Sequence, residues 1–165
     1  MAAPQKFPFK ISVLCYIKNA KGEFLMIERN NMPNKGLLSP VGGKLEMAVG
    51  ESPHECAKRE IFEETDFDVE IADLHLFGMV SERAYEGDTN WLMFLFDCKK
   101  VMDYLPEAMD EGSFKFMALD EIKKGKIPES DKKFIWDLYE KHKDGFAAMK
   151  IDCGETMTGK YCEIL

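Results

Sequence analysis

The first part of the chain consists of short apolar runs separated by polar or glycine-containing breaks. Residues 7–17 are rich in β-branched and aromatic side chains and predict a strand, and residues 23–28 predict a second one. The polar residues between them favour a turn, so we expect a hairpin. Residues 37–41 then predict a short extended segment that ends in a glycine turn at Gly42 and Gly43.

The hydrophobic period changes to that of a helix after Ser52. Ser52 is suited to be the N-cap, Pro53 to take the first helical position, and Glu55 to complete a capping box. We expect the helix to end near residues 65–66, because Asp66 tolerates the left-handed conformation better than most residues. The predicted apolar face contains Cys56, Ala57, Ile61 and Phe62.

In the remaining chain, segments with the hydrophobic period of a strand alternate with segments that have the period of a helix. Strands are expected at residues 69–84, 91–99 and 113–119, helices at 120–124 and 130–142, and a terminal hairpin at 146–153 and 160–165. These elements predict one domain over residues 1–165, with a mixed β-sheet flanked by helices. The expected fold class is α+β, of the α/β/α sandwich type.

Composition narrows the class of protein. The 165 residues carry a formal net charge of −8, which disfavours a nucleic-acid partner, because such binding needs clustered lysine and arginine. No apolar run approaches the ~20 residues needed to span a bilayer, and the N-terminus lacks the apolar core of an export signal, so we expect a cytoplasmic protein. The five cysteines form no CxxC pair, which favours reduced thiols over disulfides or zinc.

Three glutamates in the predicted helix suggest chemistry. Glu60, Glu63 and Glu64 lie three and four residues apart and therefore share one face. Such a face is often simply solvated. Crowded into a cleft, however, each like-charge pair within ~4 Å would cost roughly 4 kcal/mol at an effective dielectric constant near 20. A bound Mg²⁺ ion removes this repulsion, and a glycine pair lets the backbone approach the same ion.

The stretch around these glutamates reads GGKLEMAVGESPHECAKREIFEETDF. It resembles the motif G-x5-E-x7-R-E-U-x-E-E-x-G-U of the Nudix hydrolase family, where U is a bulky aliphatic residue. The match is nearly complete from Glu51 to Phe67, with two departures. Seven residues separate Gly43 from Glu51 where the family has five, and Asp66 stands where the family has glycine. The resemblance implies the Nudix fold for a core of about residues 7–140, leaving a C-terminal extension of about 141–165.

The resemblance also implies roles for the motif residues. Mg²⁺ or Mn²⁺ would be the cofactor, and Glu51 with Arg59 would form a supporting ion pair, although Arg59 can alternatively contact phosphate. The implied metal ligands are the Gly43 carbonyl and the catalytic carboxylates of Glu60, Glu63 and Glu64.

Residues outside the motif are candidates for binding the substrate. Arg29 and Lys44 are expected to contact phosphate, the alternative for Lys44 being a surface lysine. Some relatives read the base with an asparagine in the stretch where this chain has Ser39. A serine cannot make the two-point amide contact that selects a purine edge. The aromatic residues that can stack on a base, or else belong to the core, are Phe9, Trp91, Phe94 and Phe96.

A general base is also required for hydrolysis. MutT-like relatives often use a carboxylate from the loop before the last core strand, which makes Glu111 the first candidate. The same loop also contains Asp110, and an earlier loop region contains Glu82 and Glu86.

The implied reaction is hydrolysis of a nucleoside diphosphate linked to another group. The stretch NKGLLSPVGGKLE most resembles the MutT branch, which converts nucleoside triphosphates to monophosphate and pyrophosphate. The alternative substrates are ADP-ribose, a sugar nucleotide or a dinucleoside polyphosphate, and the alternative class is a non-catalytic nucleotide sensor. The expected partner is a small nucleotide, with no nucleic acid and no membrane, and the family resemblance allows a homodimer.

Overall fold

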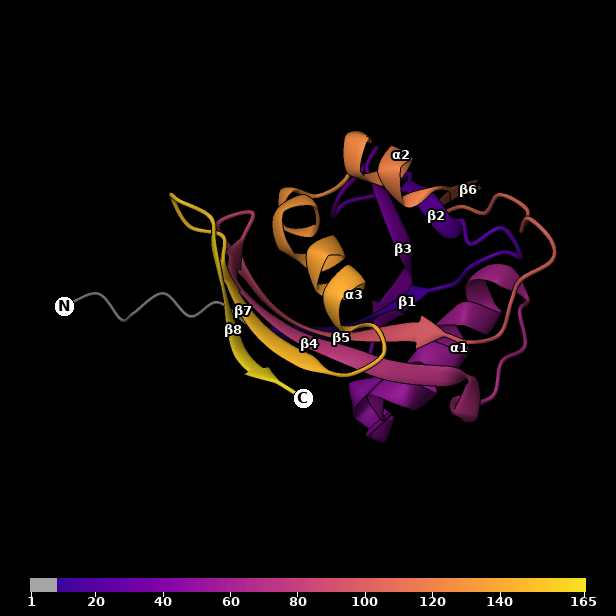
Figure 1. The fold of residues 1–165 in the computed structure, drawn as a ribbon, viewed down its shortest axis with the longest axis horizontal. Helices are drawn as coiled ribbons and strands as arrows, with labels where there is room; N and C mark the ends of the chain where they lie inside the picture. Colours follow the sequence, from indigo (N-terminus) through magenta and orange to yellow (C-terminus); the bar gives the residue numbers. More distant parts are fainter. Residues whose placement is uncertain (1–8) are drawn as a thin grey trace.

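A computed structural model describes residues 9–165, so residues 7 and 8 of the predicted first strand lie outside the described part. Its centre is an eight-stranded mixed sheet in the order β6-β2-β3-β1-β5-β4-β7-β8 (Figure 1). The β1–β5 and β4–β7 pairs are parallel, and the other pairs are antiparallel. The strands are β1 Phe9–Tyr16, β2 Phe24–Arg29, β3 Leu38–Lys44, β4 Leu74–Tyr85, β5 Thr89–Cys98, β6 Gly112–Met117, β7 Ala147–Asp152 and β8 Thr158–Ile164.

Helices cover both faces of this sheet. Helix α1 (Pro53–Thr65) packs on β1 and β3, whereas α3 (Trp136–His142) packs on β4 from the other side (Figure 1). A short helix, α2 (Leu119–Lys124), follows β6, and a π-helical turn (Asp131–Ile135) leads directly into α3. The predicted α+β sandwich, with a mixed sheet between helices, is therefore confirmed.

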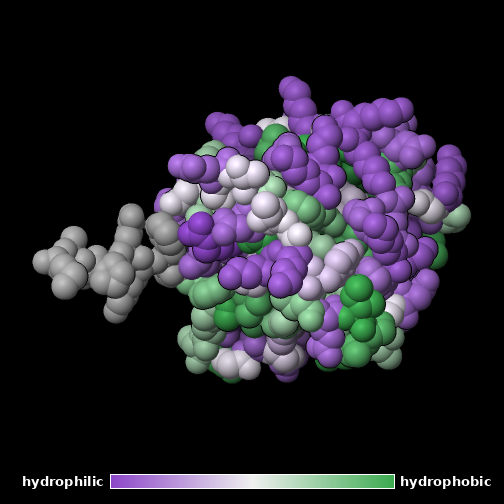
Figure 2. Space-filling model, turned by 60° about the vertical axis from the view of Figure 1, so that its left-hand side comes forward, coloured by the Kyte–Doolittle hydropathy of each residue, from purple (hydrophilic) through white to green (hydrophobic). Residues whose placement is uncertain are grey.

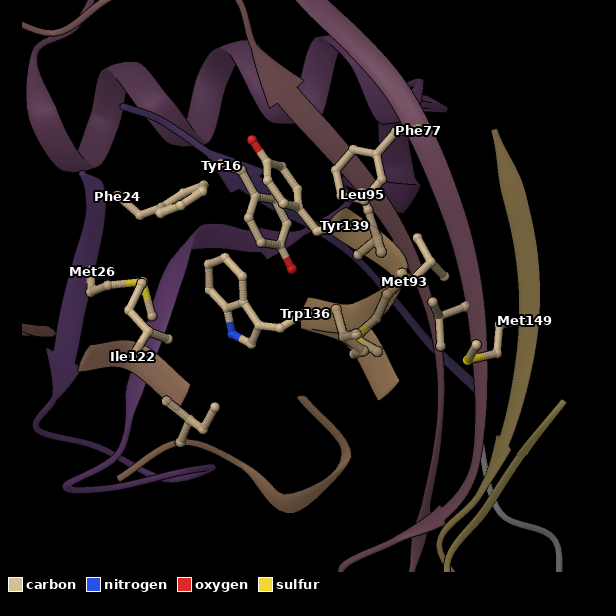
Figure 3. Packing of buried hydrophobic residues seen from close by; sticks show 14 of the residues in the cluster. Tyr16, Phe24, Met26, Phe77, Met93, Leu95, Ile122, Trp136, Tyr139 and Met149 are labelled. Atoms are coloured by element: carbon tan, nitrogen blue, oxygen red, sulfur yellow. The ribbon is translucent and has the colours of Figure 1, made fainter. Parts of the chain in front are cut away.

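The core consists of two clusters separated by the sheet. Val13 and Cys15 belong to the cluster under α1, while the neighbouring Tyr16 belongs to the cluster under α3, as the period-2 alternation of a strand requires. The ring centroid of Tyr16 lies 5.0 Å from those of both Trp136 and Tyr139 (Figure 3). Aromatic packing thus fixes α3, and the turn that precedes it, against the sheet.

The capping chemistry of α1 is as predicted. The Ser52 Oγ accepts a hydrogen bond from the Glu55 backbone N at 3.2 Å, and the Glu55 Oε2 accepts one from the Ser52 backbone N at 2.8 Å. Asp66 ends the helix in the left-handed conformation, with φ of 57°. The expectation for Phe62 is wrong, because its side chain is 51% exposed, one residue beyond the buried Ile61.

Two sequence predictions about the sheet need correction. Strand β4 begins at Leu74 rather than at residue 69, because Ile71–Asp73 form a 3-10 turn in which the Asp73 carboxylate accepts a bond from the Glu70 backbone N. Gly42 and Gly43 do not form a turn, since β3 runs straight through them. At Gly42 the reason is close packing, because a Cβ there would overlap the Val13 carbonyl of the paired strand.

The terminal residues form the predicted hairpin, and it extends the same sheet. Strand β7 runs parallel to β4, and β8 forms the edge next to it (Figure 1). Hydrophilic residues dominate the upper part of the face in Figure 2, and apolar ones gather along its lower border. Within residues 9–165, no helix has the length and apolar character needed to cross a bilayer. The homodimer stays a prediction.

Candidate active site

Helix α1 presents its glutamates beside β3. Glu64 is buried, with 9% of its surface exposed, and its Oε2 has no hydrogen-bond partner among residues 9–165. Glu60, one turn earlier, is half-buried, and Glu63 is exposed. An unpaired polar atom in the interior is costly. The Glu64 carboxylate therefore marks a position where a cation would be stabilising.

Arg59 holds the other carboxylates of the motif. Its Nε and Nη2 donate to the two carboxylate oxygens of Glu51 at 2.7 and 2.9 Å. Its Nη1 donates to Glu60 at 2.8 Å and to Glu63 at 3.1 Å. The paired hydrogen bonds lower the pKa of Glu51 to about 2. Because the guanidinium is shared among three carboxylates, it has the geometry of a supporting residue rather than of a free phosphate ligand.

Glu64 and Glu60 differ from Glu51, because their pKa values are raised. Burial raises the pKa of Glu64 to about 9, and the adjacent Glu60 and Glu111 carboxylates contribute to this rise. The positive charge of Arg29 opposes it. Burial also raises the pKa of Glu60, against the effect of Arg59. Negative charge is therefore in excess at this point, as expected of a site built for a cation.

Gly43 is required by the same cluster. A Cβ at this position would overlap the carboxylate of Glu60. The absence of a side chain lets the β3 backbone and the α1 carboxylate approach each other closely. The carbonyl of Gly43 already lies next to α1, where it is 4.0 Å from the Cys56 sulfur.

The available donors suit a hard divalent cation. Carboxylate and carbonyl oxygens are the ligands that Mg²⁺ and Mn²⁺ prefer. Within the described residues 9–165, no three acidic, histidine or cysteine side chains converge into one formed metal cluster. Two of the proposed ligands, Glu60 and Glu63, form ion pairs with Arg59 instead. The donor set fits such an ion after a local change of these two side chains.

The candidate general bases are spread over two places. Glu111 lies in the turn before β6, and its carboxylate is close enough to Glu64 and Glu60 to raise their pKa values. Asp110, its neighbour, uses its backbone carbonyl to accept a bond from the Asn30 side chain at 3.3 Å. Glu82 and Glu86 belong to the end of β4 and the turn after it. Of these candidates, Glu111 is the one that the fold brings to the α1 acids.

A cavity of about 230 Å³ lies on the α3 side of the sheet, beside this acid cluster. Its floor crosses four neighbouring strands, because Ser12 pairs with Lys44 on β3 and with Met93 on β5. The floor continues to β4, where Glu82 pairs with Trp91. Of the four aromatic residues considered for base stacking, Trp91 lines the cavity. Phe94 and Phe96 pack in the core under α1, and Phe9 is 57% exposed.

The predicted substrate-binding residues line one end of the cavity. Arg29 donates from Nε to the Pro33 carbonyl at 2.9 Å, and its charge reaches Glu64. The Lys44 side chain is exposed at the end of β3. Ser39 is buried, and its hydroxyl donates to the Pro40 carbonyl at 3.0 Å. Arg29 and Lys44 thus lie where they can link a ligand in the cavity to the α1 acids.

The other end of the cavity contains acidic residues that sequence reasoning did not assign to binding. Glu82 is 3% exposed, and Asp131 in the π-helical turn is 7% exposed. A usable signal for Glu82 existed in the sequence. It lies on the same side of β4 as Val80 and Gly78, two and four residues earlier, both of which are buried. Asp131 has no comparable signal, because its burial depends on how α3 packs.

Comparison with known proteins agrees with this geometry. The family model for the NUDIX domain matches residues 8–138. The structure is similar to that of the mutator MutT protein of Bacillus halodurans, with a TM-score of 0.73, 21% identity, and coverage of 93% of this chain and 97% of that one. It is also similar to a MutT protein of Methanosarcina mazei Go1, with a TM-score of 0.70, 25% identity, and coverage of 82% and 96%.

A third similar structure was solved with a nucleotide. The NUDIX domain of Shewanella oneidensis NrtR, complexed with ADP ribose, has a TM-score of 0.63, 14% identity, and coverage of 82% of this chain and 88% of that one. At this level of identity the likeness concerns the fold.

The NUDIX family model, together with the similar MutT structures, indicates a pyrophosphohydrolase of the MutT-like class. The chain belongs to the Nudix family. Hydrolysis of nucleoside diphosphate derivatives is general for this family, which generally uses divalent metals.

Proposed function

We propose that this enzyme hydrolyses a nucleoside triphosphate to the monophosphate and pyrophosphate, with Mg²⁺ or Mn²⁺ held at α1. The observation that carries the proposal is the buried Glu64 carboxylate, whose Oε2 has no hydrogen-bond partner among residues 9–165 and which lies beside two further acids. The ligands would be the carboxylates of Glu60, Glu63 and Glu64 and the carbonyl of Gly43. When bound, the cation neutralises charge on the phosphate oxygens and lowers the pKa of the attacking water.

The surrounding residues have separate tasks in this proposal. Glu111, close to Glu64, accepts the proton of the attacking water. Arg29 and Lys44, at the cavity end nearest the acids, bind and orient the phosphates. Glu51 keeps Arg59 in place through its paired hydrogen bonds. With the phosphates bound at Arg29 and Lys44, the nucleoside would occupy the rest of the cavity.

The MutT branch is favoured by the resemblance of the sequence and by the two similar MutT structures. The ADP ribose in the NrtR complex belongs to that protein, and a linked nucleotide of this kind remains the competing substrate. The two reactions differ in their products. A triphosphate yields monophosphate and pyrophosphate, whereas a dinucleotide or ADP-ribose yields two monophosphates.

The test is a panel of nucleoside triphosphates, ADP-ribose, sugar nucleotides and dinucleoside polyphosphates, with Mg²⁺ or Mn²⁺ and with product identification by mass. We expect monophosphate and pyrophosphate from at least one triphosphate. Glu63→Gln should lower turnover by roughly 10³-fold without loss of folding. Glu163→Gln, which changes an exposed glutamate on β8, is the matched control and should retain activity. Two monophosphates from a linked substrate, or near-full activity of Glu63→Gln, would contradict the proposal.

A further inference from the structure

The candidate general base, Glu111, lies at the tip of a tight turn that leads into β6. The Met109 backbone N donates to the Gly112 carbonyl at 2.9 Å, and the Gly112 N donates to the Met109 carbonyl at 3.1 Å. Asp110 and Glu111 are therefore the two central residues of the turn, and both are exposed. These two bonds fix the shape of the turn, but they do not fix where it lies relative to α1.

Asn30, which directly follows β2, holds both central residues of this turn. Its backbone N donates to the Glu111 carbonyl at 2.8 Å. Its side-chain Nδ2 donates to the Asp110 carbonyl at 3.3 Å. Because Asn30 is exposed, water can replace the side-chain bond at little cost in net stability. The main consequence of the two bonds is therefore the position of the turn.

A glycine allows the turn to lie this close to the end of β2. Arg29 pairs with Gly112, and Glu28 pairs with Ser113, where β2 and β6 run side by side. A Cβ on Gly112 would overlap the Glu28 carbonyl. Glycine thus lets the start of β6 pack directly against β2, which brings the turn within reach of Asn30.

Asn30 also directly follows Arg29, the proposed phosphate ligand. The backbone of Arg29 is itself held in place, since its N donates to the Leu37 carbonyl at 3.0 Å and its carbonyl accepts a bond from the Gly36 N at 2.8 Å. The Arg29 side chain lines the cavity. The same short backbone segment therefore carries the phosphate ligand and holds the turn that presents Glu111.

The chain before this turn is anchored at some distance from Glu111. Met102 is fully buried, and the Tyr104 hydroxyl donates to the Thr65 carbonyl at the end of α1, at 2.8 Å. Between Tyr104 and Met109 the chain is mostly exposed. Movement of the turn is therefore resisted mainly by the start of β6 and by Asn30.

We infer that Asn30 is a positioning residue for the proton transfer: it holds the turn of residues 109–112 so that the Glu111 carboxylate stays beside the acids of α1. The inference rests on the proposed function for the role of Glu111. A displacement of a catalytic group by about 1 Å can cost on the order of 10²-fold in rate. Because Asn30 bonds to the turn and not to the cavity, its loss should lower kcat and leave KM nearly unchanged.

Two substitutions of Asn30 remove one bond or both. Asn30→Ala deletes the Nδ2 donor and should lower kcat by roughly fivefold to twentyfold, with KM within about twofold of wild type. Asn30→Pro also deletes the backbone N–H and should lower kcat by roughly a hundredfold. The matched control is Asn31→Ala, because Asn31 is the exposed next residue and does not line the cavity. Steady-state kinetics with Mg²⁺ should give the wild-type kcat and KM for this control.

A double-mutant cycle distinguishes positioning of Glu111 from a general loss of structure. Glu111→Gln should lower kcat by roughly 10²- to 10³-fold, because the general base is lost. In that background, Asn30→Ala should change kcat by less than about twofold, because no base remains to be positioned. A merely structural role of Asn30 would produce the same loss of kcat in both backgrounds.

Hydrogen exchange measured by mass spectrometry tests the hold on the turn without any substrate. A peptide containing residues 109–112 should exchange faster in Asn30→Ala than in the wild type or in Asn31→Ala, while thermal melts show that all three are folded. Unchanged exchange, an unchanged kcat in both Asn30 variants, or a loss confined to KM would overturn the inference.

The remaining outcomes separate this inference from the proposed function. Losses from Asn30→Ala and Glu111→Gln that multiply would refute the inference and leave triphosphate hydrolysis intact. Full activity of Glu111→Gln would refute the inference together with the proposed role of Glu111. If the wild type hydrolyses no nucleotide, the proposed function fails, and faster exchange in Asn30→Ala would still support the hold of Asn30 on the turn.

Discussion

The protein contains two groups of buried acids that its fold treats in opposite ways. On α1, Arg59 binds Glu51 through two hydrogen bonds and lowers its pKa to about 2. In the cavity, Glu82 and Asp131 form no ion pair with a side chain of residues 9–165, and burial raises their pKa values to about 7 and about 8. Glu51 therefore keeps its charge and holds Arg59 beside the other acids of α1. The second group approaches neutrality, because burial disfavours the charged form of a carboxyl group.

Glu64 stands between these two cases. It belongs to α1, yet it is outside the reach of the Arg59 hydrogen bonds, and its pKa is raised to about 9. Without metal it is therefore protonated near neutral pH, and a cation must displace that proton to bind. The negative charge of Glu51 is compensated by Arg59, whereas the charge of Glu64 would be compensated by a bound cation.

The largest expected effect comes from Glu64→Gln. Turnover should fall by roughly 10³-fold, because a metal ligand is lost. Without metal, urea unfolding at neutral pH should show a gain of stability, because the amide does not have to take up a proton on folding as the Glu64 carboxylate does. Activity by product analysis and stability by circular dichroism check the two halves. A variant that retains activity, or one that is strongly destabilised, would show that Glu64 is not an acid awaiting a metal.

The raised pKa values of the cavity acids should make the stability of the protein depend on pH. An acid with a raised pKa keeps its proton in the folded state after the unfolded chain has lost it. For Asp131 this contribution is complete below about pH 4, the ordinary pKa of aspartate, and is lost as the pH rises to about 8. Tyr85 and Cys153, which also face this pair, have pKa values raised out of this window by burial. They do not contribute to the slope.

We therefore expect metal-free protein to lose stability between pH 5 and pH 8, by up to about 1.4 kcal/mol per pH unit for each such group. Urea melts across this range measure the slope. The double variant Glu82→Gln/Asp131→Asn should flatten it, leaving the part due to Glu60 and Glu64. Asp137→Asn should retain the full slope, since Asp137 forms an exposed ion pair. A slope that the double variant shares with the wild type would mean that the cavity acids are ionised.

The two regions also differ in how far the sequence alone reveals them. The α1 acids, their capping box and the end of the helix at Asp66 all depend on spacing within one element, and the fold bears out this local pattern. Glu82 and Asp131 come from separate elements. Their proximity in the cavity requires β4 to lie inside the sheet and α3 to pack over it, which no local period encodes. The sequence shows Glu82 as a charged residue among apolar positions of a predicted strand, but it does not show that Asp131 lies near it.

The glycine pair shows a further limit of the sequence. Gly42 and Gly43 were expected to form a turn, because glycine is common in turns. In the structure each is needed because another group approaches its α-carbon, the Val13 carbonyl for Gly42 and the Glu60 carboxylate for Gly43. A sequence shows that glycine is present, and only the packing shows which of its properties is used.

Substitution of each glycine by alanine separates the two reasons. Gly43→Ala should displace the flexible Glu60 side chain, lowering turnover by roughly 10²-fold with little loss of stability. Gly42→Ala forces a methyl group against a backbone carbonyl, and should cost about 1–3 kcal/mol of unfolding free energy. Urea melts and activity assays of both variants distinguish the role of Gly43 from that of Gly42. Equal losses of stability in both variants would contradict the separate roles.

The smallest effect is expected at the ion pair that supports the α1 acids. Glu51→Gln removes the charge partner of Arg59 but keeps a similar shape, so stability should fall by about 1–3 kcal/mol at neutral pH. Turnover should fall by roughly tenfold to a hundredfold, because Arg59 then forms its ion pairs with Glu60 and Glu63 alone and competes with the cation for them.

The matched control is Glu70→Gln, which breaks the Lys58–Glu70 pair and should cost less than about 1 kcal/mol, because the Glu70 side chain is 72% exposed. Raising the Mg²⁺ concentration should recover part of the Glu51→Gln activity, since the defect lies in competition for the carboxylates. If added Mg²⁺ restores nothing, Glu51 acts on the fold of the loop before α1 rather than through the charge of Arg59.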